Sequence, residues 1–487
     1  MKGIRLYAIV IAVLLLYSIL QITFGEKLAA NNGLGWDGYT YAQICDEGIQ
    51  SDNLNHYLFF RIGPSLLIHT FYKIAGISFT PESIRIGFEW LNILCLVAVA
   101  GMAGNLFDRF QLPLSHQLAG YMLLFVNFFV LRFNFYYPVL TDVPGFALGV
   151  AVLFFYLRGE PLNLMLTGLI SAFTWPPAAI TTLPLFVFPY REIGFKSCSV
   201  GMKNGLLAIV ALASGGIIYY VWEVMQAREY IAYALPVDRK WLYLSAGALV
   251  ITISPLALLF QNSSLFNHKH TNIKGVAYFV LIVLITGFIY GIVNPPVAKD
   301  LNGMAYLLKA HWFFGLAKPF ISIVSHFSYF GLLIPLLLIF WSSFSKYIGT
   351  YGLGLSIALF INLFLFGAKS ESRVLVNVFG MLCILFTLFL SHIQINTFRL
   401  LSLFVLQFIA SKCWFTLNPS TEESYFRPDG LIAWPYQQFY MHLGIYMTPE
   451  IWAVLLLSLL LFLGILSLLF FKPKWEKGFY LQFRQRL

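Results

Sequence analysis

Long uninterrupted apolar runs limit this chain to very few folds. Residues 6–20 read LYAIVIAVLLLYSIL, and residues 451–471 read IWAVLLLSLLLFLGILSLLFF. A helix needs about 20 such residues to cross the ~30 Å of hydrocarbon in a bilayer, where every backbone polar group must be bonded within the segment. A membrane barrel would instead show short alternating strands. With 59% hydrophobic and 11% charged residues, the chain is predicted to be an all-α integral membrane protein.

Apolar runs recur along the whole sequence and predict a bundle of about 12–14 transmembrane helices. No repeat, low-complexity tract or Gly/Ser linker divides the chain, so a single integral membrane domain over residues 1–487 is expected. A broken or re-entrant helix is the alternative at FTWPPAAI (173–180) and in the thirteenth run. The predicted helices cover residues 6–24, 84–106, 117–131, 143–157, 164–174, 178–189, 204–226, 241–260, 275–293, 319–341, 351–367, 375–391, 400–412 and 450–471.

Basic residues between these helices predict the orientation, because short loops rich in Lys and Arg stay on the cytoplasmic side. With Lys2 and Arg5 inside, the predicted inner loops hold about half of the 31 basic residues but few of the 21 acids. Both termini are then cytoplasmic. The net charge of +10 follows from this asymmetry, assisted by attraction to anionic membrane lipids, so no nucleic-acid partner is expected.

Two predicted outer segments are long, namely residues 25–83 and residues 413–449. The first contains YLFFRIGPSLLIHTFYKIAG at 57–76, which carries Arg61 and two further basic side chains. Such a stretch is too polar to cross a bilayer easily and favours lying in the membrane interface. A helix that packs as a lid over the bundle would explain it equally well.

The segment GWDGYTYAQICDEG at 35–48 gathers acids and aromatic rings soon after the first apolar run. Aromatic side chains prefer the membrane interface, which explains Trp36, Tyr39 and Tyr41. It does not explain Asp37, since a glycine on either side of the Trp-Asp pair favours a tight backbone that exposes the carboxylate beside an aromatic face. We therefore interpret Asp37 as a functional residue.

Three further acids have two interpretations each. Asp46 and Glu47, at the end of the same segment, fit a solvated surface as well as a site. Asp142 lies in FYYPVLTDVPG at 135–145, where an aromatic cluster precedes an acid at a helix start. Because Asp142 stands two residues before Pro144, an N-cap role alone would also justify it.

A short outer loop is predicted within AKSESRVLVNVF, residues 368–379. It places Lys369, Glu371 and Arg373 at the mouth of two apolar helices, which is costly unless the charges pair or bind something. One interpretation is a binding site. The other is a surface pair between Glu371 and Arg373, with Lys369 extending its ammonium group to water.

Two more outer stretches have side chains that suit sugars, since rings stack on pyranoses and amides bond their hydroxyls. They are LLKAHWFFG at 307–315, with Lys309 and His311, and ESYFRPDGLIAWPYQQFYMHLG at 423–444. Aromatic residues make up 18% of the chain, so such clusters also occur without function.

Together these motifs resemble the GT-C superfamily, polytopic glycosyltransferases that use polyprenyl-phosphate sugar donors. A WDG-aromatic sequence after the first transmembrane helix resembles their first outer loop, and YLFFRIGPSLLIH at 57–69 resembles the segment that follows it in bacterial members. Residues 135–145 and 368–379 are similar to later outer loops of the superfamily. The resemblance implies a GT-C-like fold with a long first extracytoplasmic loop, a bacterial inner membrane and an extracytoplasmic active site.

The resemblance implies sugar transfer to a glycan, lipid or protein acceptor, as in O-antigen modification and other polysaccharide biosynthesis of the cell envelope. Asp37 is expected to be the general base of an inverting reaction, with Asp46 and Asp142 as candidate second acids. The cations expected to contact the donor phosphate are Arg373, Lys369, Arg61 and Lys309. The expected substrate pocket comprises Trp36, Tyr39, Tyr41, Glu371 and His311.

Several catalytic motifs are missing from the sequence, including a Gly-rich phosphate loop, HExxH, a nucleophile elbow and a DxD pair. The sequence therefore assigns no cofactor, and it leaves a divalent metal open without naming ligands. The alternatives to a transferase are an O-antigen or polysaccharide polymerase, which would depend on arginines, and a lipid-linked sugar transporter or flippase, which would carry charges within its helices.

Overall fold

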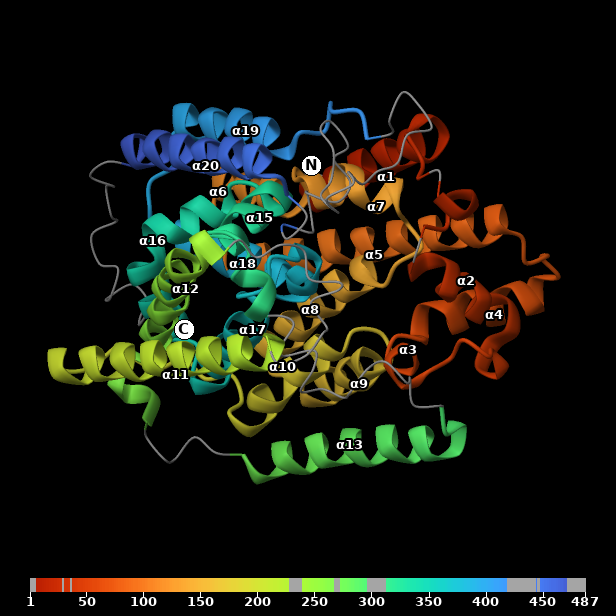
Figure 1. Ribbon diagram of the computed structural model, residues 1–487, viewed down its shortest axis with the longest axis horizontal. Coiled ribbons are helices and arrows are strands. Elements are labelled where there is room, and N and C mark those ends of the chain that lie inside the picture. Colours follow the sequence, from red (N-terminus) through yellow and green to blue (C-terminus); the bar gives the residue numbers. More distant parts are fainter. Residues whose placement is uncertain are drawn as a thin grey trace.

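The described part of the chain is entirely helical, as predicted. The computed structural model describes residues 6–28, 30–35, 37–226, 239–266, 272–295, 312–417, 444 and 447–470. Within these ranges the backbone forms no β-strand. Its one β-type pairing there is an isolated antiparallel bridge between Ser197 and Asn262. Figure 1 shows α18 (Val376–Leu390) inside the bundle and α13 (Ile273–Val293) along its edge.

Seven helices of the described residues are long and apolar enough to cross a membrane. They agree with the predicted multi-pass membrane protein, and the count rises to nine if each of two bent helix pairs is one span. The seven are α1 (Leu6–Phe24), α5 (Pro81–Arg109), α11 (Val200–Gln226), α12 (Arg239–Ile253) with η5 (Ser254–Phe260), α13, η8 (Ser372–Leu375) with α18, and α20 (Pro449–Leu469).

A continuous helix predicted over 319–341 is wrong, because the chain bends there. The helices α15 (Ile321–Phe330) and α16 (Leu333–Ile348) meet at 115°. Gly331 between them adopts a positive φ of 73°, which ends α15 at little steric cost. The side chain of Gln407 fills the corner, and its Oε1 accepts a hydrogen bond of 2.6 Å from the next backbone N–H.

The remaining helices are shorter, and the break predicted at FTWPPAAI is present between α9 and α10. A 55° bend likewise interrupts the run predicted over 117–131. These elements are α6 (Leu114–Phe125), η3 (Phe129–Phe133), α7 (Asn134–Tyr136), α8 (Asp142–Arg158), α9 (Pro161–Ala172), α10 (Pro176–Val187), α17 (Leu353–Phe366) and α19 (Thr397–Ser411), with η6 (Ser263–Phe266) as a short turn.

The segment predicted to be the first outer one, residues 25–83, folds into short helices rather than an open loop. The predicted loop at Asp37 is instead the start of α2, and a carboxylate suits the first turn of a helix because the N-terminal end of the helix dipole is positive. Most of the predicted 413–449 segment lies outside the described residues. The other elements of the first segment are η1 (Ala30–Gly33), α2 (Asp37–Glu47), η2 (Gly48–Gln50), α3 (His56–Phe59) and α4 (Gly63–Ala75).

The centre of the bundle is the contact between α8 and α18. In the span formed by η8 and α18, 94% of the most apolar stretch is buried. Gly149 of α8 lies so close to α18 that a Cβ added there would stand 2.0 Å from the carbonyl oxygen of Asn377. The two backbones therefore touch, and this contact positions the start of α18, where the charged loop described below ends.

We expect Gly149→Val to weaken this contact severely. The added side chain must push α8 away from α18, and overpacking of a core typically costs about 1–3 kcal/mol. Thermal unfolding of the purified protein in detergent should show a clearly lower midpoint. Gly101→Ala is the matched control, because a Cβ added at Gly101 of α5 meets nothing within 4 Å. Equal midpoints for the two variants would contradict the close approach.

Candidate active site

The segments 35–48 and 135–145, which are about a hundred residues apart in sequence, pack against each other. Gly35 has a positive φ of 72°, and a Cβ on it would lie 2.5 Å from the Tyr137 ring. The backbone N–H of Gly38 donates to the Tyr137 hydroxyl at 3.1 Å. Here too a Cβ would collide, at 2.8 Å from a carbonyl oxygen of the 135–145 segment. Both glycines around Asp37 are therefore required by packing against this segment.

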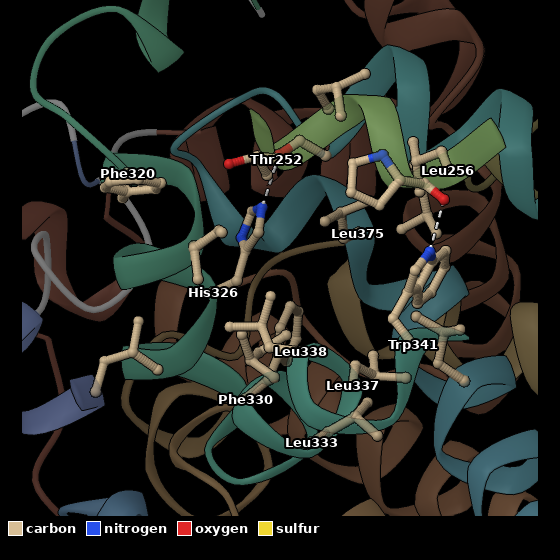
Figure 2. A pocket seen from close by; sticks show the side chains of 18 of the residues that line it. Thr252, Leu256, Phe320, His326, Phe330, Leu333, Leu337, Leu338, Trp341 and Leu375 are labelled. Atoms are coloured by element: carbon tan, nitrogen blue, oxygen red, sulfur yellow. Dashed lines mark hydrogen bonds between the residues drawn. The ribbon is translucent and has the colours of Figure 1, made fainter. Parts of the chain in front are cut away.

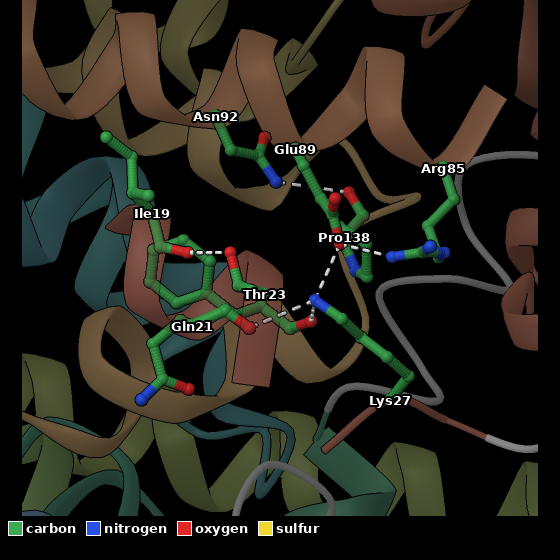
Figure 3. A network of polar contacts seen from close by, with 9 residues as sticks. Ile19, Gln21, Thr23, Lys27, Arg85, Glu89, Asn92 and Pro138 are labelled. Carbon is green, nitrogen blue, oxygen red and sulfur yellow. Dashed lines mark hydrogen bonds and ion pairs between the residues drawn. The ribbon is translucent and has the colours of Figure 1, made fainter. Parts of the chain in front are cut away.

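A buried carboxylate on α5 anchors the same region (Figure 3). Glu89 is fully buried and forms ion pairs with Lys27 at 2.7 Å and with Arg85 at 2.6 Å. One turn along, Asn92 donates to the carbonyl oxygen of Pro138 at 3.1 Å. These bonds hold the chain entering α2 and the 135–145 segment on one scaffold helix, so the position of Asp37 is fixed from both sides.

Asp37 meets the charged loop before α18. Its Oδ2 lies 2.9 Å from Nη2 of Arg373, which is 336 residues further along the chain. The Arg373 Nε also donates to Glu371, whose second carboxylate oxygen pairs with Lys369. Exposure separates the two acids, since 52% of the Asp37 side chain is exposed against 8% for Glu371. Asp37 can reach a substrate, whereas Glu371 holds the cations.

Side chains of helix α15 hold the charged loop in place through hydrogen bonds. Ser325 Oγ donates to the carbonyl oxygen of Ser370 at 2.6 Å, and the ring nitrogens of His326 lie 3.0 Å from Ser372 Oγ and 3.1 Å from the Gly367 carbonyl oxygen. The surface-pair interpretation of this loop is wrong in its location, because the side chains of Arg373 and Glu371 are only 20% and 8% exposed. The pair between them does form, but Lys369 also pairs with Glu371 instead of extending to water.

Electrostatics within the loop favour charged side chains. Burial opposes ionisation of Glu371, but Lys369 and Arg373 hold its pKa well below the usual range of a carboxyl group. Burial lowers the pKa of Lys369, and Glu371 opposes that effect. An ionised Glu371 therefore lies between two cations. Arg373 donates to Glu371 through Nε and to the more exposed Asp37 through Nη2.

Arg61 joins the site from the turn between α3 and α4. Its guanidinium carbon lies 4.8 Å from the centre of the Tyr57 ring and 4.8 Å from the centre of the Trp175 ring, which are cation–π contacts. Burial lowers the pKa of Arg61, but the neighbouring Tyr57, Tyr41 and Asp142 raise it, and the net effect keeps the guanidinium charged. Because two rings fix the planar guanidinium, its N–H groups are pre-oriented for a partner.

Asp142 completes the group at the start of α8. It is not the N-cap, since Thr141 takes that place and α8 begins at Asp142 itself, so the capping interpretation is wrong. The carboxyl is buried, and within the described residues its Oδ1 has no hydrogen-bond partner. Burial raises its pKa to about 6, while Arg373 and Arg61 act in the opposite direction. Hereafter the charge cluster means Asp37, Arg61, Asp142, Lys369, Glu371 and Arg373.

The raised pKa of Asp142 predicts a pH-dependent stability. The fold favours the protonated carboxyl, so its contribution is fully present below about pH 4 and is lost as the pH rises through about 6. Asp142→Asn is neutral at every pH and should not show this loss. We expect the unfolding midpoint of the variant, relative to wild type, to rise between pH 4 and pH 7 in detergent. A difference that stays constant with pH would contradict the assignment.

The other predicted site residues divide into two groups. Tyr41, one turn along α2 from Asp37, is buried and interacts electrostatically with Arg61. Tyr39 is 48% exposed, and its hydroxyl accepts a 3.4 Å hydrogen bond from Gln43 on the same helix. Asp46 lies at the opposite end of α2 from Asp37, about 13 Å away at 1.5 Å rise per residue. Tyr41 therefore belongs with the charge cluster, whereas Asp46 lies in a separate pocket.

Three predicted site residues, Trp36, Lys309 and His311, lie outside the described residues. Within the described ranges, no three His, Cys, Asp or Glu side chains come together so that they could hold a metal ion. We therefore assign no metal ligands.

The interpretation of the sequence missed several residues that shape the site. Tyr57 and Trp175 hold Arg61, and the Trp175 indole N–H donates to Asn377 of α18 at 3.1 Å. Ser325 and His326 support the charged loop. A signal for this pair exists, because Ser322, Ser325 and His326 fall on one face of an otherwise apolar helix. Trp175 had no such signal beyond its place in the break FTWPPAAI.

Comparisons with protein-family models, curated proteins and solved structures found no match to this chain. The assignment of a function therefore depends on the chemistry of the charge cluster and its surroundings.

Proposed function

We propose that this protein is a membrane glycosyltransferase that moves a sugar from a polyprenyl-phosphate donor to a glycan, lipid or protein acceptor. The observation that carries the proposal is the pairing of a half-exposed carboxylate, Asp37, with Arg373 at the edge of a largely buried group of cations. Transfer from a phosphate ester needs a base for the acceptor hydroxyl and positive charge for the leaving phosphate. The charge cluster provides both within one site.

Asp37 is the proposed general base of an inverting reaction. A carboxylate within hydrogen-bond reach of the acceptor hydroxyl can take its proton as the hydroxyl attacks the anomeric carbon. A retaining route would need a second carboxylate about 5–5.5 Å away as nucleophile. Asp46 is too distant for this role, and Asp142 is buried. One accessible acid favours direct displacement.

The cations of the cluster would receive the negative charge of the leaving phosphate. Arg373, Lys369 and Arg61 are held by ion pairs and rings before substrate binds, so little reorganisation is needed during the reaction. Near pH 7 the cluster has three cations and three anions, because a carboxyl group with a pKa of about 6 is mostly ionised there. Protonation of Asp142 at lower pH leaves one excess positive charge, which suits an anionic phosphate.

An apolar cavity supports a lipid-carried donor (Figure 2). It measures about 490 Å³ and is lined almost entirely by apolar side chains of α12, η5, α15 to α18 and α20. Gly367 and Leu375, which bracket the charged loop, both line it, and so does His326, which supports that loop. The cavity therefore reaches both ends of the charged loop, so an isoprenoid chain bound there would run toward a phosphate held by the cations of that loop.

The proposed location is the bacterial inner membrane, with both termini cytoplasmic and the site extracytoplasmic. In support, the charge cluster draws on the segments that follow α1 and precede α18, which the distribution of basic residues assigns to the outer side. Lipid-carried sugars are the donors expected on that side.

A polysaccharide polymerase is the second candidate, because two of the cluster's largely buried cations are arginines, Arg61 and Arg373. The two functions differ in their dependence on Asp37. A polymerase would keep its activity without that carboxylate but not without the arginines.

The proposal is tested by sugar transfer in membranes that contain the protein. The donors are a panel of polyprenyl-phosphate sugars and the corresponding nucleotide sugars, and membranes without the protein serve as background. We expect transfer above background from at least one polyprenyl-phosphate sugar and none from nucleotide sugars. Transfer from nucleotide sugars alone, or elongation of preformed lipid-linked glycans without any monosaccharide transfer, would overturn it.

A further inference from the structure

A second polar site lies at the far end of α2 from Asp37. There the end of α2, the turn η2 and one face of α4 line an open groove of about 650 Å³, hereafter the α2–α4 pocket. In Figure 1 both helices lie together at one end of the molecule. The lining residues are Asp46, Glu47, Gly48, Ile49, Gln50, Leu66, His69 and Lys73. Acids thus lie on the α2 side, and basic groups on the α4 side.

The acids of this pocket are not paired by the described part of the surrounding fold, and Lys73 makes a cation–π contact, with its Nζ 5.6 Å from the centre of the Phe79 ring. Asp46, Glu47 and Lys73 are exposed, and no described residue forms an ion pair with any of them. His69 is fixed, because its Nδ1 lies 2.7 Å from the Cys45 carbonyl oxygen and must donate its proton there. Its Nε2 consequently faces Gly48, at the pocket wall. The pocket therefore offers two carboxylates from α2 opposite one ammonium group and one imidazole from α4.

Next to its pocket-lining face, α4 exposes a row of apolar side chains, which indicates that the pocket lies beside lipid. Leu67, Phe71 and Ile74 are 58%, 61% and 82% exposed and follow one another at helical spacing, so they form an apolar stripe without a protein partner in the described chain. Only a short turn separates α4 from α5, which is long and apolar enough to span a membrane. A helix with this pattern at the start of a span lies in the membrane interface.

We propose that the α2–α4 pocket binds the headgroup of a zwitterionic phospholipid that carries a primary amine, of the phosphoethanolamine type. The ammonium group would donate to Asp46 and Glu47, and the phosphate would accept from Lys73, as charge-assisted hydrogen bonds. His69 would add a second donor to the phosphate, through Nε2, only when its ring is protonated. The acyl chains would then lie along the stripe of Leu67, Phe71 and Ile74.

The charge pattern distinguishes this headgroup from other lipids. An anionic glycerol headgroup would bring a phosphate near two carboxylates with no cation of its own to offset them. A choline headgroup has the same charges but no N–H group, so it cannot donate to the carboxylates. Only an amine-bearing zwitterion satisfies both sides. This site stands independently of the proposed sugar transfer, since none of its residues contacts the charge cluster.

The test measures lipid binding to the full-length protein in detergent after removal of bound lipid. The probes are short-chain phosphatidylethanolamine, phosphatidylcholine and phosphatidylglycerol, with native mass spectrometry as readout. We expect the ethanolamine lipid to bind roughly tenfold more tightly than the other two, in line with the strength of charge-assisted hydrogen bonds. Equal affinities for all three lipids would overturn the proposal.

Variants separate the two sides of the pocket. Asp46→Asn combined with Glu47→Gln should remove the preference for ethanolamine over choline, whereas Lys73→Gln should weaken both lipids to a similar extent. Glu82→Gln is the matched control, an exposed acid in the first turn of α5 outside the pocket. Unchanged preference in the double variant, or binding of soluble phosphoethanolamine as tight as that of the lipid, would also contradict the proposal.

Discussion

Replacing Asp37 by Asn should abolish sugar transfer. The substitution preserves the size of the side chain but removes its ability to accept a proton, and loss of a general base typically lowers the rate about 10²–10⁴-fold. Arg373 keeps its bonds to Glu371, so the charged loop should stay in place. The measurement is the initial rate of transfer in membranes that contain equal amounts of wild-type and variant protein.

The control for this result is Asp52→Asn. Asp52 is an exposed acid in the same 25–83 segment, beyond α2, and has no place in the charge cluster. It should transfer sugar at the wild-type rate. Transfer by Asp37→Asn within a few-fold of wild type would refute the role of Asp37 as base, and together with inactive arginine variants it would favour a polymerase.

Glu371→Gln should destabilise the protein more than any other single change in the cluster. Glu371 joins Lys369 and Arg373, and its loss leaves two largely buried cations with one half-exposed partner between them. Removing one member of a buried ion pair typically costs about 3–5 kcal/mol, because the remaining charge is uncompensated. We expect a large fall in the midpoint of thermal unfolding and in the amount of protein recovered from membranes.

A surface pair provides the matched control for this prediction. Arg158 and Glu160 also form an ion pair, but at the more exposed end of α8. Exposed pairs contribute about 0–1 kcal/mol, so Glu160→Gln should leave the midpoint nearly unchanged. If both glutamate variants unfold at the same temperature, the charged loop is solvated and its cations are not pre-organised.

The sequence predicted the class of fold but not the path of every helix. Apolar runs such as residues 6–24 and 450–471 identify long helices because length and hydropathy are local properties. The bend between α15 and α16 is not local. Hydrophobicity continues through Gly331, and the corner forms because Gln407 from another helix bonds the backbone there. The contact with Gln407 therefore accounts for a bend that the apolar sequence of residues 319–341 does not predict.

The candidate site was predictable to the extent that its residues interrupt apolar surroundings. Asp37, Asp142, Glu371 and Arg373 stood out because acids and cations are rare in this chain, and the structure brings them together. What could not be predicted is which charge each residue meets. Asp142 satisfied the sequence pattern of a helix cap, yet the structure buries it beside the cluster, since its surroundings come from α2, the α3–α4 turn and the loop before α18.

The 336 residues between the partners Asp37 and Arg373 also separate them in time during synthesis. At about 5–20 residues per second, a ribosome needs roughly 20–70 s to reach the arginine after it has made the aspartate. A nascent chain held in the insertion machinery would therefore carry the proposed base and Arg61 but neither Lys369 nor Arg373, so the proposed phosphate-binding group would be incomplete. Catalytic competence would arrive late, after most of the helices have been synthesised, so incomplete chains would be inert toward the lipid-linked sugars around them.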